Sequence, residues 1–591
     1  MTARLKKAAP RKRAVPALDR PARQDPTPIL LASGLEPAQV EAILRPYGLQ
    51  RIQEADANLQ SMAGDPHQRR QLADILPRLL EAIGKTADPD LALNQWERWL
   101  ASGVSRSAML GYLRSAPRMV DLVCGIFGNS NSLASTLVSD PLLLYWLAQQ
   151  KVLSTAPSKA GMEHALRQSL GAVISTDLKL DALRRFRRRE ILRIGVRDLL
   201  RLADVVETTA SLSDLASVLI DAAYRIVDAG LRSQYGVPMH RNRQGRWVET
   251  GFTVIGMGKL GGHELNYSSD VDVLYVCESH EGETKQAAPR GVKAKGSLQE
   301  GLSNEEYFEI LARELTKALT EQTHEGYLYR VDLRLRAEGS VGQLTRSLGE
   351  YDKYYRTRGQ VWERLALLKA WPIAGSQEVG RSFVKLVRPF VLSSPSERSE
   401  VEQGLAIVEE VRSVKERIDA KMAERGHEQR NVKLGDGGIR EIEFFVQTIQ
   451  VLAGRRLRGI LDRGTIGSLA RLRSVGILTA QQQGGLTRAY QFLRDVEHKL
   501  QMVHDMQTHA LPDRQDKLER CAIRMGYTGT SRSAALMQFQ ADHAGHRTIV
   551  HDIFQSFFHT PKTSKLFKAV LRVLNKRDRP IRRPKLGRYA G

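Results

Sequence analysis

The sequence is poor in cysteine, in aromatic residues and in long apolar runs. Its three cysteines, Cys124, Cys277 and Cys521, lie far apart and outside any Cys-x-x-Cys spacing, so neither a disulfide framework nor a zinc cluster is indicated. No stretch approaches the roughly 18 uninterrupted apolar residues of a membrane span, and the N-terminus lacks the apolar segment of a secretion signal. We therefore expect a cytoplasmic protein without a membrane partner.

The length and composition are those of a globular protein with several cores. Of its 591 residues, 42% are hydrophobic, 26% are charged and only 6% are aromatic. A chain of this size exceeds a single ordinary domain, and this apolar fraction excludes disordered and collagen-like proteins.

Positive charge is concentrated at the two ends of the chain. The formal net charge is +23, but residues 1–24 hold eight Lys and Arg against one acid, and residues 562–591 hold eleven against one. Prolines interrupt both runs, so we expect flexible basic arms at 1–28 and 561–591. No aromatic residues for stacking on bases alternate with the basic ones, which makes nucleic acid an improbable partner. The arginine-rich run at 183–190 similarly favours a solvated or internally paired helix face over a nucleic-acid helix.

Hydrophobic periodicity predicts a mostly helical α+β protein in which one α/β segment interrupts helices. Three stretches rich in β-branched and aromatic residues predict strands at 247–256, 270–277 and 327–335. Between the last two, the capping box that starts at Ser303 predicts a helix. The predicted parts are a helical region at 29–204, the α/β domain at 205–375 and a helical bundle, without strands, at 376–560.

A glycine-rich turn follows the first predicted strand. Gly256, Gly258 and Gly261 have the spacing of a dinucleotide-binding fingerprint. The next strand begins only nine residues after Gly261, which is too soon for the full helix of a Rossmann unit. The glycines more plausibly allow backbone amides to approach a phosphate, with Lys259 supplying a positive charge.

Acidic residues mark the second and third predicted strands. Side chains alternate along a strand, so Asp270 and Asp272 are expected on one face, and Asp332, Arg334 and Arg336 share a face of the third strand. Adjacent carboxylates repel unless a cation neutralises them, and Mg²⁺ prefers carboxylate oxygens together with substrate phosphates. The three aspartates are therefore candidate catalytic and metal-binding residues for two-metal phosphoryl or nucleotidyl transfer. The candidate nucleotide- and phosphate-binding residues are Gly256, Gly258, Lys259, Gly261, Ser268, Ser269, Arg334 and Arg336.

Two further motifs have a functional and a structural interpretation. His498, Asp505 and His509 have the spacing of one helix face, which is compatible with a metal-dependent hydrolase but more often reflects hydrogen bonds between packed helices. The segment 435–438, with three glycines, is either a phosphate-binding turn or, more simply, the entry to a helix.

Five segments together resemble the glutamine synthetase adenylyltransferase/adenylyl-removing enzyme family. They are GMGKLGGHELNYSSDVD (256–272), YRVDLRLRAEGSVG (329–342), YYRTRGQVWERLALLKAWPIAG (354–375), GDGGIREIEFFVQ (435–447) and DVEHKLQMVHDMQTHALP (495–512). The resemblance implies a nucleotidyltransferase domain of the DNA polymerase beta type, followed by a helical bundle. It also implies metal binding by Asp270, Asp272 and Asp332.

The family enzyme has two catalytic halves, and this chain resembles the N-terminal, adenylyl-removing one. Asn266 and Ser268 stand where the adding half tends to have Gly and Asn. The resemblance implies Mg²⁺-dependent phosphorolysis of adenylyl-tyrosine on glutamine synthetase, with ADP as product. The same geometry run with ATP would add AMP instead. The PII signal protein is a possible second partner. The alternatives are an RNA nucleotidyltransferase, and a noncatalytic regulator that binds glutamine synthetase or PII.

Overall fold

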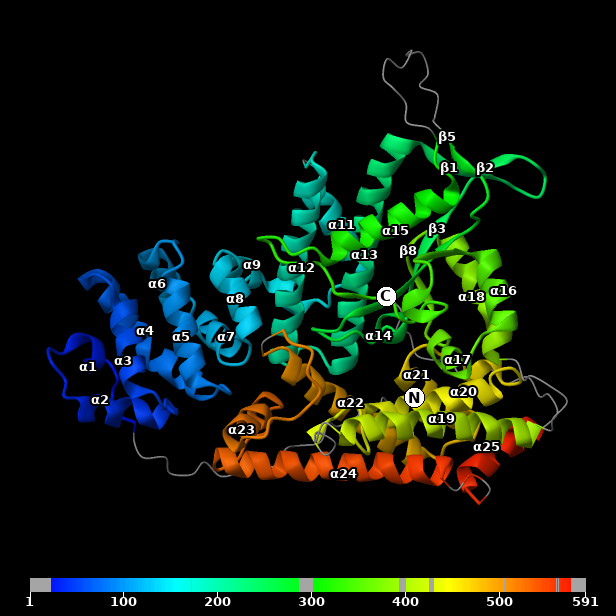
Figure 1. Cartoon of the computed structure of the whole chain (residues 1–591). Helices are drawn as coiled ribbons and strands as arrows, with labels where there is room; N and C mark the ends of the chain where they lie inside the picture. The colour runs from blue at the N-terminus through cyan, green and yellow to red at the C-terminus, as the bar shows by residue number, and fades with distance from the viewer. Residues whose placement is uncertain are drawn as a thin grey trace, which may run out of the picture.

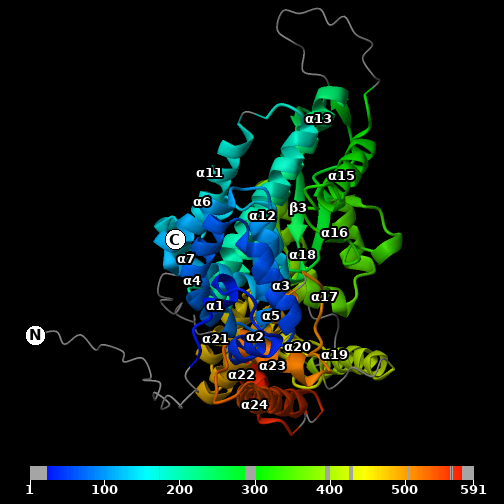
Figure 2. The ribbon, with the colours of Figure 1, turned by 90° about the vertical axis from the view of Figure 1, so that its left-hand side faces the viewer.

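The computed structural model describes residues 23–171, 173–285, 301–392, 400–424, 430–503, 505–559, 561 and 563–575. Figure 1 shows the N-terminal helices on one side, the mixed α/β part above, and the C-terminal helices along the lower edge. In the turned view of Figure 2, the long helix α24 (Arg532–Phe558) stays at the bottom, and α13 (Val205–Tyr235) rises toward the opposite end.

The N-terminal part consists of helices, and none of its described residues before Val237 belongs to a strand. Asp65 and Asp88 accept hydrogen bonds from the backbone N–H groups of Gln68 and Leu91, so two of these helices start with side-chain caps. The bounds before α13 are α1 (Pro28–Leu31), α2 (Pro37–Leu44), η1 (Arg45–Tyr47), α3 (Ile52–Ala63), α4 (Pro66–Gly84), α5 (Pro89–Leu100), α6 (Arg106–Ser115), α7 (Pro117–Phe127), α8 (Asn131–Ser139), α9 (Leu143–Leu147), α10 (Gln150–Ser154), α11 (Lys159–Leu170) and α12 (Thr176–Leu199).

The arginine-rich run lies on α12, and its side chains are paired within the chain. Arg184 contacts Asp181 at 2.8 Å, and both Arg185 and Arg188 contact Glu325. The prediction of an internally paired helix face is confirmed.

An antiparallel sheet and a larger mixed sheet form the α/β part. The smaller sheet has the order β2-β1-β5, and the larger has the order β6-β4-β3-β8, with β7 also pairing with β4. The strand bounds are β1 (Val237–Arg241), β2 (Trp247–Glu249), β3 (Phe252–Gly256), β4 (Val271–Cys277), β5 (Glu283–Lys285), β6 (Val331–Asp332), β7 (Thr345–Ser347) and β8 (Trp371–Gly375). The helices of this part are α14 (Gly258–Gly261), α15 (Asn304–Thr320), η2 (Gly339–Val341), α16 (Leu348–Thr357), α17 (Val361–Leu367) and α18 (Gln377–Leu392).

Helices cover both faces of the larger sheet, because alternate residues of its central strands are apolar on both sides. Val273 and Tyr275 of β4 join the core that contains α13 and α15. Leu274 and Val276 of the same strand join a separate core with α16 and α18. A central strand with both faces covered reads as the continuous apolar run seen here.

The strand predictions succeed for the centre of the sheet and fail at its edge. Strand β4 confirms the prediction for 270–277, and Thr250 and Gly251 separate the predicted strand 247–256 into β2 and β3. The predicted strand 327–335 is wrong beyond β6, since only Val331 and Asp332 pair with β4 before the chain turns away. Strand β8 was not predicted.

The C-terminal part is again helical, and its described residues form no strand beyond one isolated bridge between Asn431 and Ala510. Its elements are α19 (Glu400–Ala423), α20 (Ile439–Ala453), η4 (Arg458–Ile460), α21 (Thr465–Ser474), α22 (Ala480–Gln501), α23 (Gln515–Arg524), α24 and α25 (Lys565–Asn575). Helix α24 packs along α20, α22 and α23, as Figure 1 shows.

The prediction of a flexible arm over 561–591 is wrong for the residues of α25. Leu566, Phe567 and Val570 are buried in the C-terminal core, so one apolar helix face holds this segment in place despite its positive charge. The rest of that arm from 576, and residues 1–22 of the first arm, lie outside the described residues.

The predicted class of a mostly helical α+β protein is confirmed. The identification of the α/β part as a nucleotidyltransferase domain of the polymerase beta type stays a prediction. Within the described ranges, no helix has the length and apolar character that a membrane crossing requires.

Candidate functional site

The two acidic strand segments lie side by side in the larger sheet. Strands β4 and β6 are parallel, and their register places Asp272 directly opposite Asp332. Register partners project to the same face of a sheet, so these two carboxylates share one face. Asp270 immediately precedes β4. The structure thus pairs Asp272 with Asp332 and places Asp270 directly before the same strand, but the three carboxylates do not form a group of ligand atoms within 4.8 Å of one another.

The glycine-rich turn packs directly against Asp272. Gly258 has a φ of +51°, and a Cβ atom there would lie 2.4 Å from Oδ2 of Asp272. At Gly261, a Cβ would lie 2.1 Å from the carbonyl oxygen of Lys369, and at Gly256 it would lie 2.9 Å from Ile373. Only glycine allows the turn to approach the carboxylate and the neighbouring backbone this closely.

The carboxylate of Asp272 is strongly affected by its surroundings. Burial and the negative charge of Asp332 raise its pKa to about 6, although the ammonium of Lys433 opposes the rise. A carboxylate held in this way gains most from a nearby cation, because the cation removes both penalties.

The other two acids each have an arginine partner. Asp270 Oδ1 accepts a hydrogen bond from Arg330 Nε at 2.7 Å, and Arg330 also donates to the Ser268 carbonyl oxygen at 2.6 Å. Asp332 accepts from Arg334 at 2.5 Å, which holds the pKa of Asp332 below its usual value. The donor set consists of hard oxygen atoms beside a glycine cradle, which fits Mg²⁺.

The two arginines predicted on the third strand have different environments. Arg334 is 77% exposed and contacts only Asp332 among the described residues. Arg336 is buried, and its guanidinium donates to the carbonyl oxygens of Leu333, Ser340 and Gly342. The alternation that put both on one strand face is wrong, because β6 ends at Asp332. Arg336 stabilises the following loop.

Lys259 points toward the C-terminal helices. Its Nζ lies 3.1 Å from Glu497 Oε1, and burial lowers its pKa to about 7 although Glu497 opposes that shift. Its predicted contact with a phosphate is therefore not supported by its present hydrogen bonds. Ser268 is buried and Ser269 is partly exposed beside Asp270.

A buried polar network behind the turn was not predicted. Glu497 of α22 is fully buried and accepts from Asn266 Nδ2 at 2.6 Å, while His509 Nδ1 lies 2.7 Å from its other oxygen. Arg494 and His498 of the same helix contact Asn266 Oδ1, at 2.5 and 2.8 Å. The sequence signal for this network was the set of polar residues that interrupt the apolar stripe of α22.

The prediction that His498, Asp505 and His509 share one helix is wrong, because α22 ends at Gln501 and Asp505 has a φ of +51°. The histidine contacts with Asn266 and Glu497 are packing hydrogen bonds, as the structural interpretation held. Gly438 is the N-cap of α20, so the segment 435–438 serves as a helix entry.

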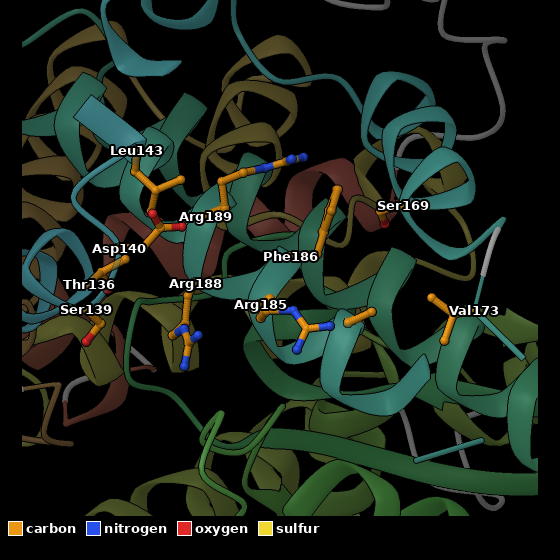
Figure 3. A pocket seen from close by; sticks show the side chains of 11 residues that line it. Thr136, Ser139, Asp140, Leu143, Ser169, Val173, Arg185, Phe186, Arg188 and Arg189 are labelled. Carbon is orange, nitrogen blue, oxygen red and sulfur yellow. The ribbon is translucent and has the colours of Figure 1, made fainter. Parts of the chain in front are cut away.

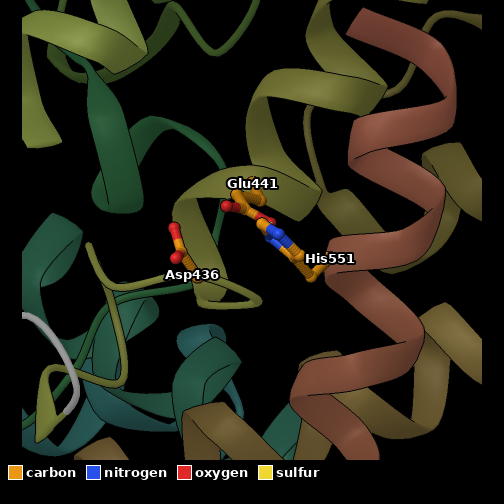
Figure 4. Close-up of side chains that lie close together, drawn as sticks. All are labelled: Asp436, Glu441 and His551. Atoms are coloured by element: carbon orange, nitrogen blue, oxygen red, sulfur yellow. The ribbon is translucent and has the colours of Figure 1, made fainter. Parts of the chain in front are cut away.

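Asp436, Glu441 and His551 form the one group of three ligating side chains found close together among the described residues (Figure 4). The Lys415 ammonium lies 3.4 Å from Glu441 and 3.6 Å from Asp436. Lysine thus already supplies the positive charge that a metal ion would bring, and we assign no ion to this group.

A cavity of about 260 Å³ lies between α8, α11 and α12, and Arg185, Arg188 and Asp140 are among its lining residues (Figure 3). None of the three candidate aspartates lines it. Both arginines form ion pairs with Glu325.

The chain is similar to known proteins over most of its length. Residues 120–386 match the family model described as glutamate-ammonia ligase adenylyltransferase. Relatives named bifunctional glutamine synthetase adenylyltransferase/adenylyl-removing enzyme include those of Nitrosococcus oceani, 35% identical over 439 residues, and Thioalkalivibrio sulfidiphilus, 36% identical over 439 residues. A third, from Brucella melitensis, is 35% identical over 448 residues.

This chain belongs to that family. The matches cover 74% of this chain and 42% of each of these three relatives, so the chain spans less than half the length of the adenylyltransferases it matches. The family is one of nucleotidyltransferase enzymes, as the names of its members state. A second family model, described as GlnD PII-uridylyltransferase, matches residues 409–558 in the C-terminal helices.

Proposed function

We propose that this chain removes AMP from an adenylylated tyrosine of glutamine synthetase by phosphorolysis. The observation that carries the proposal is the placement of Asp272 opposite Asp332, beside a turn in which Gly258 lies against the Asp272 carboxylate. Family membership supplies the substrate class, since the relatives are named for action on glutamine synthetase.

In this reaction, an oxygen of inorganic phosphate attacks the phosphorus of the adenylyl-tyrosine. The new P–O bond gives ADP, the bond between phosphorus and the tyrosine oxygen breaks, and the phenolate takes up a proton. Asp270, Asp272 and Asp332 would hold Mg²⁺, which when bound would stabilise charge on the attacking and leaving oxygens.

The residues of the chain have separable roles in this proposal. Asp272 lies between the turn at Gly258 and Asp332, and this close approach limits where its carboxylate can move. Arg330 and Arg334 neutralise the acids before substrate binds. Arg334 is exposed enough to turn toward the non-reacting phosphate oxygens, and it is the arginine we retain as a phosphate ligand.

Asn266 supports the removing direction over the adding one. Its side chain joins Glu497, Arg494 and His498, so a glycine at this position would leave those buried groups without their shared partner. The chain's Asn266 is thus matched to its own helix α22. Transfer of AMP from ATP is the second candidate, because the same acids serve both directions.

The match of residues 409–558 to a PII-uridylyltransferase model supports a further proposal, that the C-terminal helices contact the PII signal protein. Binding of purified PII to the full chain, measured by calorimetry, tests it. No binding with or without ATP would contradict it.

The proposed function is tested by incubating the full chain with adenylylated glutamine synthetase, phosphate and Mg²⁺. We expect ADP release that is lost with EDTA and in D272A. ATP with unmodified synthetase, and a short RNA, are parallel substrates. Tailing of the RNA would favour an RNA nucleotidyltransferase, and tight synthetase binding without turnover would favour a noncatalytic regulator.

A further inference from the structure

Within the described part of the chain, Lys433 is a partly buried lysine without a hydrogen-bonded or ionic partner, whereas four other partly or fully buried lysines are paired. Lys259, Lys369, Lys415 and Lys499 each have a carboxylate oxygen within 3.1 Å. Lys433 Nζ makes no hydrogen bond or ion pair with any residue in the described ranges.

The backbone around Lys433 is fixed. Its N–H donates to Asn431 Oδ1 at 3.0 Å, and its carbonyl oxygen accepts from the Arg440 N–H at 2.9 Å. The neighbouring Val432 N–H donates to the His509 carbonyl oxygen at 2.9 Å. The segment before α20 is thus tied to α20 itself and to the loop after α22, and the lysine side chain extends from a rigid base.

The contacts of neighbouring residues place Lys433 near the candidate site. Val432 bonds the His509 backbone, and the side chains of His509 and Lys259 both contact Glu497. Lys259 follows Gly258, which lies against the Asp272 carboxylate.

Burial lowers the pKa of Lys433, and the carboxylates of Glu497, Glu443 and Asp272 oppose this shift, while Arg440 adds to it. The same interaction acts on Asp272. Glu497 already has Lys259, Asn266 and His509 as partners, so it does not need Lys433 as its counter-ion.

A partly buried ammonium without a partner is unfavourable, and a ligand anion would complete it. We propose that Lys433, supplied by the C-terminal helical part, contacts the phosphate oxygens of the substrate bound beside Asp272. A lysine binds phosphate as a compact point charge with three donors, so one Nζ can contact non-reacting oxygens of either inorganic phosphate or the nucleotide. This inference rests on the proposed function for its reaction, and on the geometry alone for its ligand class.

The test compares K433Q, K433R and K353Q, the last an exposed lysine on α16 that serves as the matched control. We measure ADP affinity with Mg²⁺ by calorimetry, the KM for phosphate and for adenylylated synthetase separately, and the melting temperature. Losing a charge-assisted hydrogen bond predicts that K433Q weakens ADP binding and lowers kcat/KM about ten- to a hundredfold. We expect K433R to recover part of this loss and K353Q to match the unchanged chain.

The two phosphate sources have different signatures. A rise in KM for inorganic phosphate alone assigns Lys433 to the attacking phosphate, and a rise in KM for the adenylylated protein assigns it to the transferred group. A K433Q variant that keeps both ADP affinity and kcat/KM would overturn the inference while leaving the proposed function intact. If the unchanged chain shows no phosphorolysis, the proposed function fails, and ADP binding still tests Lys433.

A measurement on the unchanged chain guards against misfolding of the variant. ADP with Mg²⁺ should protect Lys433 from acylation, read by mass spectrometry, and should leave Lys353 equally reactive. Equal labelling of Lys433 with and without ADP would contradict the proposed contact.

Discussion

Lys369 joins three segments through one buried ammonium, and its removal should be severe. Its Nζ lies 3.1 Å from Glu264 Oε2 and 3.1 Å from Glu443 Oε1, and all three side chains are buried. Glu264 follows the glycine-rich turn and Glu443 belongs to α20, so the group links the α/β part to the C-terminal helices. Lys369→Met keeps most of the side-chain length and removes the charge.

The size of the stability loss in K369M depends on which partners Glu264 and Glu443 keep. Removing one partner of a buried ion pair costs about 3–5 kcal/mol, because the remaining charge is left uncompensated. Glu264 keeps the N–H of Thr465 at 2.6 Å, and Glu443 keeps Arg440 at 3.6 Å. We therefore expect the free energy of unfolding to fall by about 3 kcal/mol, the lower end of that range.

The loss should depend on pH in a defined direction. Burial alone would raise the pKa of Glu443, but Lys369 and Arg440 lower it to about 2. In the unchanged chain its contribution to stability is present above the unfolded carboxyl pKa and is lost as the pH falls toward 2. In K369M the buried carboxylate of Glu443 has a raised pKa. The destabilisation caused by its uncompensated charge is therefore full at pH 7 and disappears as the carboxylate becomes protonated.

Urea unfolding of the full chain, followed by fluorescence and circular dichroism at pH 7 and pH 5, measures both effects. The triple change K369M/E264Q/E443Q should recover most of the loss, since no buried charge remains, and K353M is the exposed control. A K369M loss under about 1 kcal/mol at pH 7, or one that grows toward pH 5, would refute the reasoning.

Three other outcomes are expected. G258A should lower kcat/KM for phosphorolysis at least about tenfold, because the new Cβ meets the Asp272 carboxylate. The control G230A on α13, where a Cβ meets no atom within 4 Å, should leave kcat/KM unchanged. Equal rates for the two variants would contradict the close approach of Gly258 to Asp272. His543 is buried against Phe539, and burial lowers its pKa to about 4. As the pH falls, this histidine is protonated in the unfolded chain before it is protonated in the folded one, so the free energy of unfolding should fall by about 2 kcal/mol from pH 7 to pH 5. Urea titrations of H543L should no longer show this dependence on pH. W99A should cost about 3–5 kcal/mol, seen as a lower urea midpoint, because Trp99 fills the N-terminal core against Trp96.

Local patterns were enough for the elements whose neighbours are close in sequence. The β-branched run of β4 and the capping box at Ser303 both predicted elements that the structure contains. The third predicted strand failed, because a two-residue edge strand has too little pattern and is defined only by its pairing with β4. Helix α25 was not predicted, because the many positive charges of this segment indicated a flexible arm although one face of the helix is apolar.

The residues of the candidate site also fall into those that local sequence patterns predicted and those that they misplaced. Asp270 and Asp272 could be singled out because they follow the glycine turn and alternate along a predicted strand. Asp332 could be singled out from the alternation along its own predicted strand. Arg336 was misplaced because the alternation was extended past the end of β6, into a loop whose carbonyl oxygens hold its guanidinium.

Contiguous motifs and short-range periodicity predicted the family and the mostly helical class, and they singled out Asp270, Asp272 and Asp332 as candidate site acids. Which charges meet between the α/β part and the C-terminal helices follows from long-range packing. Glu497, Lys369 and Lys433 lie more than 70 residues from at least one group they face, such as Lys259, Glu443 or Asp272. Burial then sets their charge states, and burial is a property of the folded assembly of helices and sheet, which no local pattern specifies.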